Sequence, residues 1–375
     1  MDKLDLIAPC LFGIESIAAD EFRRMGFEDA AAENGRVRLS GSFNMLARAN
    51  ICSRFAERIL INLGEFSAVT FTELFDGVRA LPWENYIGRD DAFPVNGWSI
   101  SSQLFSIPDC QSIIKKAIVE RLKTKYHLSR FSETGAEYRV RFSIHKNNVT
   151  MMIDTSGEGL HKRGYRRNSN SAPIKETLAA AMCALARIYP DTQMYDPFCG
   201  SGTLLIESAL MAANIAPGLR RFFAAERFGF IPESVWREER TRAQDLIRHN
   251  VDFRAHGSDI DKAAAELTLE NARRAGVLKY VSAKAGDIHN FSLPEERCLT
   301  VTNPPYGERL LDVKAAEELY AVMGNRFNPG YGRKYFIISP DDEFERFFGR
   351  TADKRRKLYN GMLKCQLYMY FKNNN

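Results

Sequence analysis

Residues 302–307 read TNPPYG, a stretch whose residue types could hold an amino group. Proline lacks an N–H and has a fixed φ, so the backbone carbonyl of Pro304 is held out as an acceptor with no competing donor beside it. The side-chain oxygen of Asn303 supplies a second acceptor, and two neighbouring acceptors match the two hydrogens of an –NH₂ group. Tyr306 offers a flat face for a planar ring. We therefore expect these residues, with Pro305, to hold an aromatic amine so that its nitrogen lone pair points at an electrophile.

A second motif, DPFCGSGTLLIE, runs from Asp196 to Glu207. It predicts a strand end, a tight turn through Gly200 and Gly202, and a helix that begins at Thr203. The missing Cβ atoms let a ligand approach the backbone closely, and the helix start offers free N–H groups. The motif is neither the dinucleotide fingerprint, whose third glycine is missing, nor a P-loop, since no Gly-Lys-Ser/Thr follows. An acid directly before the loop would suit a cationic ligand, although a purely structural turn fits the motif equally well.

Two further acids follow predicted strands, Asp259 in GSDID and Asp287 in AGD. Either acid alone could be a helix N-cap instead of a ligand, and Asp261 is expected to be such a cap. The carboxyl ends of parallel strands meet at one edge of a sheet, so both acids would lie beside the same crevice as Asp196. One carboxylate there can hold a ribose diol. Three acids suit an adenosine that carries a positively charged group.

Regular βα alternation after residue 173 would position these motifs. Alternating βα units predict a parallel sheet with helices on both faces. The final stretch, 355–372, predicts a hairpin that turns at Asn360-Gly361. The first 156 residues also alternate strands and helices, with a hairpin turn at Asn34-Gly35 and a helix expected from Asp109, as its N-cap, to Tyr126. The expected organisation is 1–55, 56–156, a Gly-rich and basic connector 157–172, and 173–375.

Composition excludes several classes of protein. The chain is 45% hydrophobic and 26% charged, which is ordinary for a globular protein. Its seven scattered cysteines include no C-x-x-C pair, which argues against a disulfide framework or a zinc cluster, and no metal is expected. No apolar run reaches membrane-spanning length and no signal-peptide pattern begins the chain, so we expect a cytoplasmic protein without a membrane partner. We expect Trp83, Trp98 and Trp236 to be core or domain-boundary residues.

Basic residues cluster locally although the net charge is only +5. Between Leu160 and Lys175 there are five basic residues and no acid, and KKAIVERLKTK begins at Lys115. Such clusters suggest a polyanionic partner, although solvated helix faces would give the same pattern.

The motifs DPFCGSGT, GSDID, AGD and NPPYGERL, in this order, resemble those of S-adenosylmethionine-dependent amino-methyltransferases. With LHKRGYR and APIKETLAAAM, they are most similar to the THUMP-containing RNA guanine-N2 methyltransferases, and in particular to the N-terminal half of bifunctional 23S rRNA methyltransferases. The resemblance covers essentially the whole chain. It implies an α/β fold: a Rossmann-like class I methyltransferase domain with a terminal antiparallel hairpin, preceded by an α+β ferredoxin-like and THUMP region.

The resemblance also implies S-adenosylmethionine as the cofactor. The loop from Asp196 to Thr203 would hold its methionine end, and Asp259 its ribose hydroxyls. Ile260 would lie against the adenine, and Asp287 would meet the adenine amino group. The implied cofactor-binding residues are Asp196, Phe198, Gly200, Ser201, Gly202, Thr203, Asp259, Ile260, Asp287 and Asn303.

The implied partner is RNA, either 23S rRNA or a ribosomal assembly intermediate, with the target guanine flipped out or already unpaired. Transfer RNA is the alternative substrate, and an inactive RNA-binding assembly factor is the alternative kind of protein. The Asn-Pro-Pro-Tyr motif also serves methylation of DNA adenine and of a glutamine side chain. The expected RNA-binding residues are Lys115, Lys116, Lys162, Arg163, Arg166 and Arg167.

Overall fold

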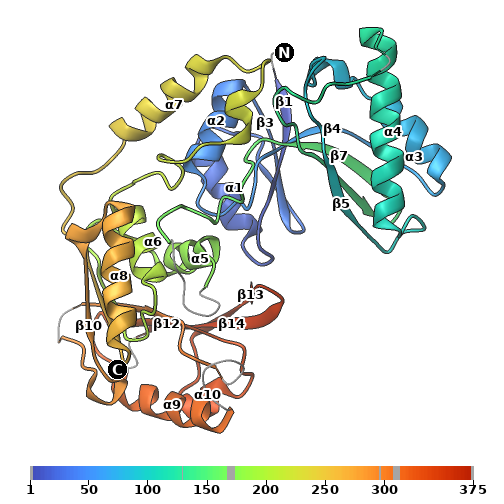
Figure 1. Ribbon diagram of the computed structural model, residues 1–375. Coiled ribbons are helices and arrows are strands. Elements are labelled where there is room, and N and C mark those ends of the chain that lie inside the picture. Colours follow the sequence, from blue (N-terminus) through green and yellow to red (C-terminus); the bar gives the residue numbers. More distant parts are fainter. Residues whose placement is uncertain (1–2, 129, 167–173, 295–296, 307–312, 373–375) are drawn as a thin grey trace.

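The computed structural model describes residues 3–128, 130–166, 174–294, 297–306 and 313–372. The described elements include two seven-stranded sheets, one in each half of the chain. Figure 1 shows the N-terminal sheet and its helices above the C-terminal sheet. No helix in these ranges has both the length and the apolar character needed to cross a membrane.

The N-terminal sheet has the strand order β2-β3-β1-β4-β7-β6-β5. Its neighbouring strands are antiparallel except β5 and β6, which are parallel. The predicted turn at Asn34-Gly35 joins β2 to β3, with Gly35 at a φ of +72°. Strand β1 pairs with both β3 and β4, so one sheet continues across residue 55. The domain boundary expected there stays a prediction. The strands are β1 Leu4–Pro9, β2 Ala31–Glu33, β3 Arg36–Gly41, β4 Leu60–Ser67, β5 Val95–Ile100, β6 Val140–His145 and β7 Asn148–Asp154.

Four helices pack on one face of this sheet. Local signals set their ends: α3 begins with a capping box in which Thr70 and Glu73 bond each other's backbone N–H. The N-cap predicted at Asp109 is wrong, because Ser106 occupies the cap position and Asp109 lies in the first turn, beside a proline suited to a helix start. The helices are α1 Glu15–Arg24, α2 Phe43–Cys52, α3 Phe71–Ala80 and α4 Ile107–Tyr126.

The C-terminal sheet has the strand order β10-β9-β8-β11-β12-β14-β13. The first five strands in that order are parallel, as predicted. The predicted hairpin is also present, and its second strand, β14, lies antiparallel between β12 and β13. The strands are β8 Gln193–Asp196, β9 Arg254–Asp259, β10 Val281–Ala285, β11 Leu299–Thr302, β12 Lys334–Ser339, β13 Lys354–Asn360 and β14 Leu363–Tyr370.

Helices cover both faces of the C-terminal sheet. Alternate residues of β12 show this: Phe336 and Ile338 belong to the core that contains α5 and α6, whereas Tyr335 and Ile337 belong to the core that contains α9 and α10. The carboxyl edge of the sheet therefore lies between two helical layers. The helices are α5 Glu176–Ala186, α6 Thr203–Ala212, α8 Lys262–Ala275, α9 Val313–Arg326 and α10 Phe344–Phe348.

The two halves share one hydrophobic core and also contact each other through polar and backbone groups. Helix α7 (Glu233–Asp245) returns from the C-terminal half to lie beside α2 (Figure 1), where Arg48 forms a bidentate ion pair with Glu239 at 2.8 Å. Arg54 donates to the carbonyls of Leu210 and Ile215, at 3.3 and 3.0 Å. These contacts connect the N-terminal sheet to the helices next to the predicted cofactor loop.

Candidate cofactor and amine site

The predicted acids and the Asn-Pro-Pro-Tyr motif lie at one edge of the C-terminal sheet. Asp196 ends β8, Asp259 ends the neighbouring β9, and Asp287 lies two residues beyond the end of β10. On the other side of β8, Asn303 directly follows β11. The structure therefore brings the predicted groups together at the carboxyl ends of adjacent parallel strands, which is where such sheets bind ligands.

Asp196 joins the ends of β8 and β11. Its carboxylate is almost fully buried and accepts hydrogen bonds from Thr302 Oγ1 at 2.6 Å and from the backbone N–H of Phe198 at 3.1 Å. Burial raises the pKa of Asp196 to about 7, although both hydrogen bonds lower it, and the charge of Asp259 raises it further. A positively charged ligand group would offset the cost of ionising this carboxyl.

The glycine turn has the backbone geometry that its sequence predicts. Gly200 and Gly202 adopt positive φ values of +53° and +80°. A Cβ on Gly202 would lie 2.7 Å from the side chain of Thr268, whereas a Cβ on Gly200 would meet no atom within 4 Å. The N–H of Gly200 donates to Asp259 Oδ2 at 2.9 Å, and the N–H of Asp261 donates to Asp259 Oδ1 at 3.0 Å. The turn thus holds Asp259 in one orientation and leaves open space beside Gly200.

Ser201 and Thr203, both buried, complete the start of α6. Their hydroxyl oxygens lie 3.3 Å apart, and Arg166 Nη1 donates to Thr203 Oγ1 at 3.2 Å. Arg166 also pairs with Glu176 at 2.5 Å. Its side chain is therefore engaged at the predicted cofactor loop and not presented to solvent as an RNA contact.

The adenine side of the predicted site is more exposed. Ile260 is 78% exposed and presents apolar surface directly after the strand end. Asp287 accepts hydrogen bonds from the backbone N–H of His289 at 2.9 Å and from its ring at 2.7 Å, and these bonds lower the pKa of the carboxyl. Phe198 packs against the core of α9 and α10. His289 was not identified from the sequence, because a lone histidine two residues after an acid has no distinct signal.

The Asn-Pro-Pro-Tyr corner contains an unused acceptor. The side-chain oxygen of Asn303 is buried and has no hydrogen-bond partner in the part of the chain that the structure describes. Pro304 is buried, and Tyr306 is half-buried with its phenol oxygen 2.9 Å from Asn360 Nδ2, which donates to it. Sequence reasoning assigned Asn360 only to a turn, since its proximity to Tyr306 depends on the packing of the terminal hairpin.

These features fit a cationic nucleoside such as S-adenosylmethionine. The buried acid suits a cationic group, the open side of Gly200 leaves room for a ligand against the backbone, and the oriented carboxylate of Asp259 suits a diol. Cys199 lies in the same loop, but burial raises the pKa of its thiol, so it is unsuited to act as a nucleophile. Within the described ranges no group of His, Cys, Asp and Glu side chains could hold a metal ion.

The predicted RNA-binding residues do not form one surface. Lys115 on α4 pairs with Glu133 at 2.5 Å and lies 3.7 Å above the ring of Phe93, whereas Lys116 is exposed. Lys162, in the connector, is exposed and pairs with Glu158. Figure 1 shows α4 on the outer side of the N-terminal half, away from α5 and α6 near the middle of the molecule. Arg167 lies outside the described residues.

The prediction that Arg163 binds RNA is wrong for this structure. Its side chain is only 2% exposed and pairs with the fully buried Glu207 of α6 at 3.4 Å. It also donates to the carbonyls of Leu160 and Arg54, each at 2.6 Å. The high charge density of the connector suggested an external polyanion, but the partner of Arg163 is the buried carboxylate of Glu207.

Of the three tryptophans expected in the core or at a domain boundary, two lie in the core. Trp83 and Trp236 are buried. Trp98, on the edge strand β5, is 46% exposed and is therefore not a core residue.

The sheet order and the groups at its carboxyl edge define an S-adenosylmethionine-dependent methyltransferase. Comparison with family models identifies the particular family. Residues 163–369 match the RMKL-like methyltransferase domain, residues 5–60 the RlmL ferredoxin-like domain, and residues 68–154 the THUMP domain. The chain belongs to the RMKL-like methyltransferase family, and S-adenosylmethionine is its cofactor.

Individual relatives agree with this assignment. The chain is 41% identical over 373 residues to "Putative RNA methyltransferase YpsC" of Bacillus subtilis, covering 99% of this chain and 97% of that protein. It is 32% identical to the ribosomal RNA large subunit methyltransferase K/L of Psychromonas ingrahamii, covering 98% of this chain but only 50% of that longer protein. The crystal structure of SMU.472 in complex with SAH (S-adenosylhomocysteine) matches over the whole of both chains, with 41% identity and a TM-score of 0.94.

Proposed function

We propose that this protein methylates the exocyclic N2 of a guanine in 23S rRNA. The observation that carries the proposal is the buried, unpartnered oxygen of Asn303 beside the rigid Pro304. A buried acceptor without a donor costs free energy, roughly 1–3 kcal/mol. An amino group that enters this corner would offset the cost by donating to it.

The residues at the corner suggest how the amine would react. Asn303 Oδ1 and the Pro304 carbonyl would each accept one amino hydrogen, which orients the nitrogen lone pair away from them. Tyr306 would stack on the base, with its hydroxyl held by Asn360. When bound, S-adenosylmethionine would supply a sulfonium methyl group for direct transfer to the nitrogen; S-adenosylhomocysteine would be the leaving group, and the methylated nitrogen would release one proton to solvent. The contribution of the protein is then mainly orientation and exclusion of water.

Two observations support RNA as the substrate class. The N-terminal half matches a THUMP domain, and one relative is named as a ribosomal RNA large subunit methyltransferase. The present chain spans about half of that relative. The choice of guanine N2 depends on the family resemblance of the LHKRGYR, APIKETLAAAM and NPPYGERL motifs.

Nucleoside mass spectrometry of a deletion strain tests the substrate. We expect N2-methylguanosine to disappear from 23S rRNA and to be unchanged in tRNA. Loss from tRNA alone would favour the tRNA alternative, and unchanged nucleosides in both would contradict methylation of either RNA.

Asn303→Ala tests the chemistry of the corner. We expect it to lower kcat about a hundredfold, because one oriented hydrogen-bonding group at a reacting centre is typically worth that much. Asn303→Asp is the matched control, since it keeps an oxygen acceptor and should lose less activity. Methyl incorporation from labelled S-adenosylmethionine into rRNA from the deletion strain measures both variants.

The same variant separates an enzyme from an assembly factor. If Asn303→Ala abolishes methylation but the purified protein still binds rRNA, the enzymatic role stands. If the unsubstituted protein transfers no methyl group while ribosome assembly still requires it, the role in binding is primary.

A further inference from the structure

The N-terminal sheet has one face without helices. Register partners Leu6 and Ile61 belong to the core shared with the helices, whereas the next pair, Ile7 and Leu60, forms a separate small cluster with Met152. No helix residue belongs to that cluster. Since side chains alternate along a strand, every second residue of this sheet lies on the helix-free face. In Figure 1, α1 and α2 flank one end of the sheet and α3 and α4 the other, with the strands between them.

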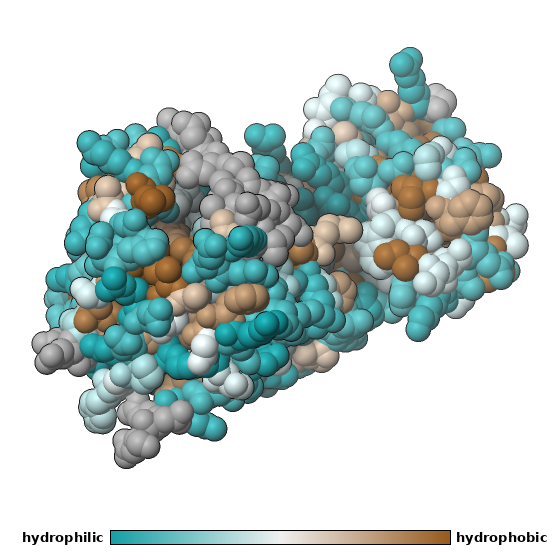
Figure 2. All heavy atoms as spheres, turned by 90° about the horizontal axis from the view of Figure 1, so that it is seen from below, coloured by the Kyte–Doolittle hydropathy of each residue, from teal (hydrophilic) through white to brown (hydrophobic). Residues whose placement is uncertain are grey.

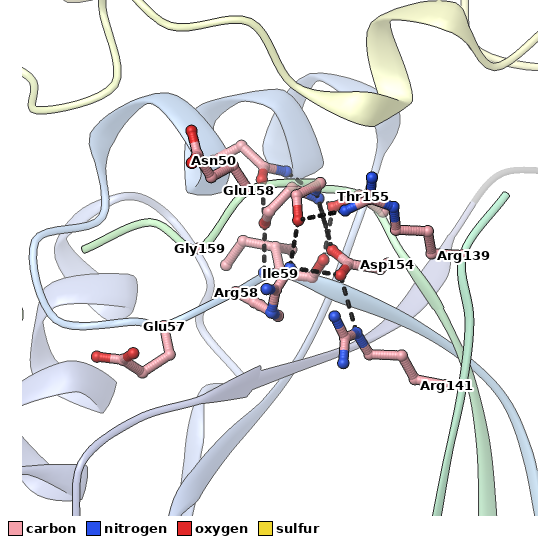
Figure 3. Close-up of polar contacts among 12 residues, drawn as sticks. Asn50, Glu57, Arg58, Ile59, Arg139, Arg141, Asp154, Thr155, Glu158 and Gly159 are labelled. Atoms are coloured by element: carbon pink, nitrogen blue, oxygen red, sulfur yellow. Dashed lines mark hydrogen bonds and ion pairs between the residues drawn. The ribbon is translucent and has the colours of Figure 1, made fainter. Parts of the chain in front are cut away.

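A cluster of arginines lies on this face around one buried acid (Figure 3). Asp154, at the end of β7, has a fully buried side chain. Arg58 approaches it at 2.5 Å and Arg141 of β6 at 2.9 Å, and Arg139 donates to the neighbouring carbonyl of Gly157 at 3.3 Å. Asp154 also accepts two backbone N–H groups, so the arginines are not its only donors.

The arginines outnumber the acid that they surround. The side chains of Arg58 and Arg141 are 25% and 30% exposed, although Asp154 beneath them is not exposed at all. The two terminal guanidinium nitrogens of Arg141 have no hydrogen-bond partner among the described residues. Burial lowers the pKa of Arg58; Asp154 opposes this, and the charges of Arg141 and Arg139 lower it further. The cluster therefore presents unneutralised cationic donors to solvent.

An exposed aromatic side chain lies on the neighbouring strand. In the β5–β6 register Asn96 pairs with Arg141, so Trp98 is two residues further along and on the same face. Strand spacing places its Cα about 8 Å from that of Arg141. Trp98 is 46% exposed and Ile100, the next residue on this face, is 56% exposed. Aromatic rings beside basic groups on an open sheet face are a usual platform for single-stranded RNA.

The acids on this face leave the arginine cluster with one positive charge in excess, because Glu137 neutralises Arg139 and Asp154 offsets only one of Arg58 and Arg141. Glu137 pairs with the exposed Arg139 at 2.6 Å, and Glu65 of β4 pairs with Arg38 of β3. Figure 2, which views the molecule from below, shows two lobes separated by a recess with a largely hydrophilic surface. A polyanion suits such a surface better than an apolar protein partner does.

We propose that this helix-free face is an RNA-binding surface, on which Arg58 and Arg141 hold a backbone phosphate and Trp98 stacks an unpaired base. The inference rests on the proposed function, because it assumes that the substrate is RNA. It moves the main RNA contact from the lysines of α4, which lie on the helical side, to the opposite face of the same sheet.

Fluorescence anisotropy with a short labelled single-stranded RNA of mixed sequence tests the site on the full chain. Trp98→Ala should weaken binding about tenfold, because it removes one stacked base. Phe222→Ala is the matched control: Phe222 is 78% exposed but lies in the C-terminal half, so the affinity should not change. Trp98→Phe should retain most of the affinity.

Arg141→Gln tests the phosphate contact. We expect weaker binding and a salt dependence whose logarithmic slope falls by about one, as for the loss of one phosphate contact. The control is the double variant Lys115→Gln/Lys116→Gln, for which we expect affinity near that of the unsubstituted chain. If the Arg141→Gln variant fails to fold, the Trp98→Ala variant still tests the site, because Trp98 is exposed and its substitution should not disturb the fold.

Titration with S-adenosylhomocysteine distinguishes the possible failures. All variants should bind it as the unsubstituted chain does, because the substitutions lie far from the carboxyl edge of the C-terminal sheet. If the unsubstituted chain binds RNA but Trp98→Ala and Arg141→Gln do not weaken it, the site is overturned and the proposed function survives. If the unsubstituted chain binds S-adenosylhomocysteine but no RNA, both the proposed RNA function and this site are overturned.

Discussion

At the scale of single residues, the protein leaves two groups of the site incompletely satisfied. Among the described residues, Asn303 has a buried oxygen without a donor, and Asp196 is a buried carboxyl that accepts no hydrogen bond from a cationic side chain. Both arrangements cost folding free energy. A ligand that supplies amino hydrogens to one and a positive charge to the other would offset that cost, which is why these two residues are the best markers of the site.

The raised pKa of Asp196 predicts pH-dependent cofactor binding. Because this pKa is about 7, the carboxyl is largely protonated at pH 6 and ionised at pH 8. If the cofactor binds the ionised form, its affinity should rise with pH across this range and binding should release protons near pH 7. Calorimetry in two buffers of different ionisation enthalpy measures the protons released. The Asp196→Asn variant should bind the cofactor weakly, and its affinity should not change with pH across this range. If this variant released as many protons on binding as the unsubstituted protein, the assignment to Asp196 would be contradicted.

The same group has the opposite effect on the stability of the free protein. The folded-state pKa lies above the ordinary value of 3.8, so the folded state binds this proton more tightly than the unfolded state does. The contribution of Asp196 to stability is therefore greatest at low pH and falls as pH rises from about 4 to about 7. Cofactor binding would recover part of this loss.

At the scale of elements, the terminal hairpin connects the N-terminal half to the amine corner. Arg356 of β13 donates to the Gly13 carbonyl at 2.8 Å, and a Cβ on Gly13 would lie 2.4 Å from the carbonyl oxygen of Lys357. At the end of the same strand, Asn360 donates to Tyr306. One strand thus contacts both the α1 end of the first sheet and the ring expected to stack on the substrate.

Asn360→Ala should test whether the hairpin positions Tyr306. We expect kcat to fall about fivefold, because a hydrogen bond of about 1 kcal/mol that orients the ring is lost. The affinity for S-adenosylhomocysteine should not change, and this separates positioning from a general loss of structure. Met362→Ala, at a fully exposed position in the same turn, is the control and should behave as the unsubstituted enzyme does. Equal activity of both variants would show that Tyr306 needs no such support.

At the scale of the whole molecule, buried charges connect the two halves through the connector. Arg163 of the connector pairs with Glu207 of α6, which also accepts from the buried Tyr165 hydroxyl at 3.1 Å. The side chain of Arg54, in the N-terminal half, donates hydrogen bonds to two backbone carbonyls of the C-terminal half. The backbone carbonyl of Arg54 accepts a hydrogen bond from Arg163. The relative placement of the N-terminal half and the methyltransferase domain therefore depends on a desolvated network.

Arg163→Met should destabilise the protein by about 3–5 kcal/mol, since it leaves Glu207 buried without its cation. Denaturant unfolding monitored by circular dichroism measures the change. Lys162→Met is the adjacent control: that lysine is 60% exposed, so we expect a change within about 0.5 kcal/mol. Similar midpoints for the two variants would contradict the role given to the buried pair.

Much of the architecture could be predicted from the sequence, because the signals concerned are local. The βα alternation, the Asn34-Gly35 and Asn360-Gly361 turns and the positive-φ glycines depend on residues close together in the chain. The edge where Asp196, Asp259 and Asn303 meet was also predictable, since parallel strands place their carboxyl ends together. The roles of these residues in binding and catalysis stay predictions.

What failed depends on contacts between distant segments. Arg163 and Arg166 looked like RNA ligands because they are basic, but their partners Glu207 and Glu176 lie on helices that follow the connector. Trp98 was expected to be a core or domain-boundary residue, yet it is not in the core, because its strand forms the edge of the sheet.

The sequence by itself determined the βα order, the turns and the chemistry available at the strand ends, because backbone stereochemistry and strand direction act locally. Only the tertiary structure decided which arginines are neutralised and which face solvent, which face of the first sheet has no helix packed on it, and that the terminal hairpin reaches Tyr306. The reason is physical: burial and charge pairing depend on which distant segments pack together, and a residue's type does not specify its neighbour.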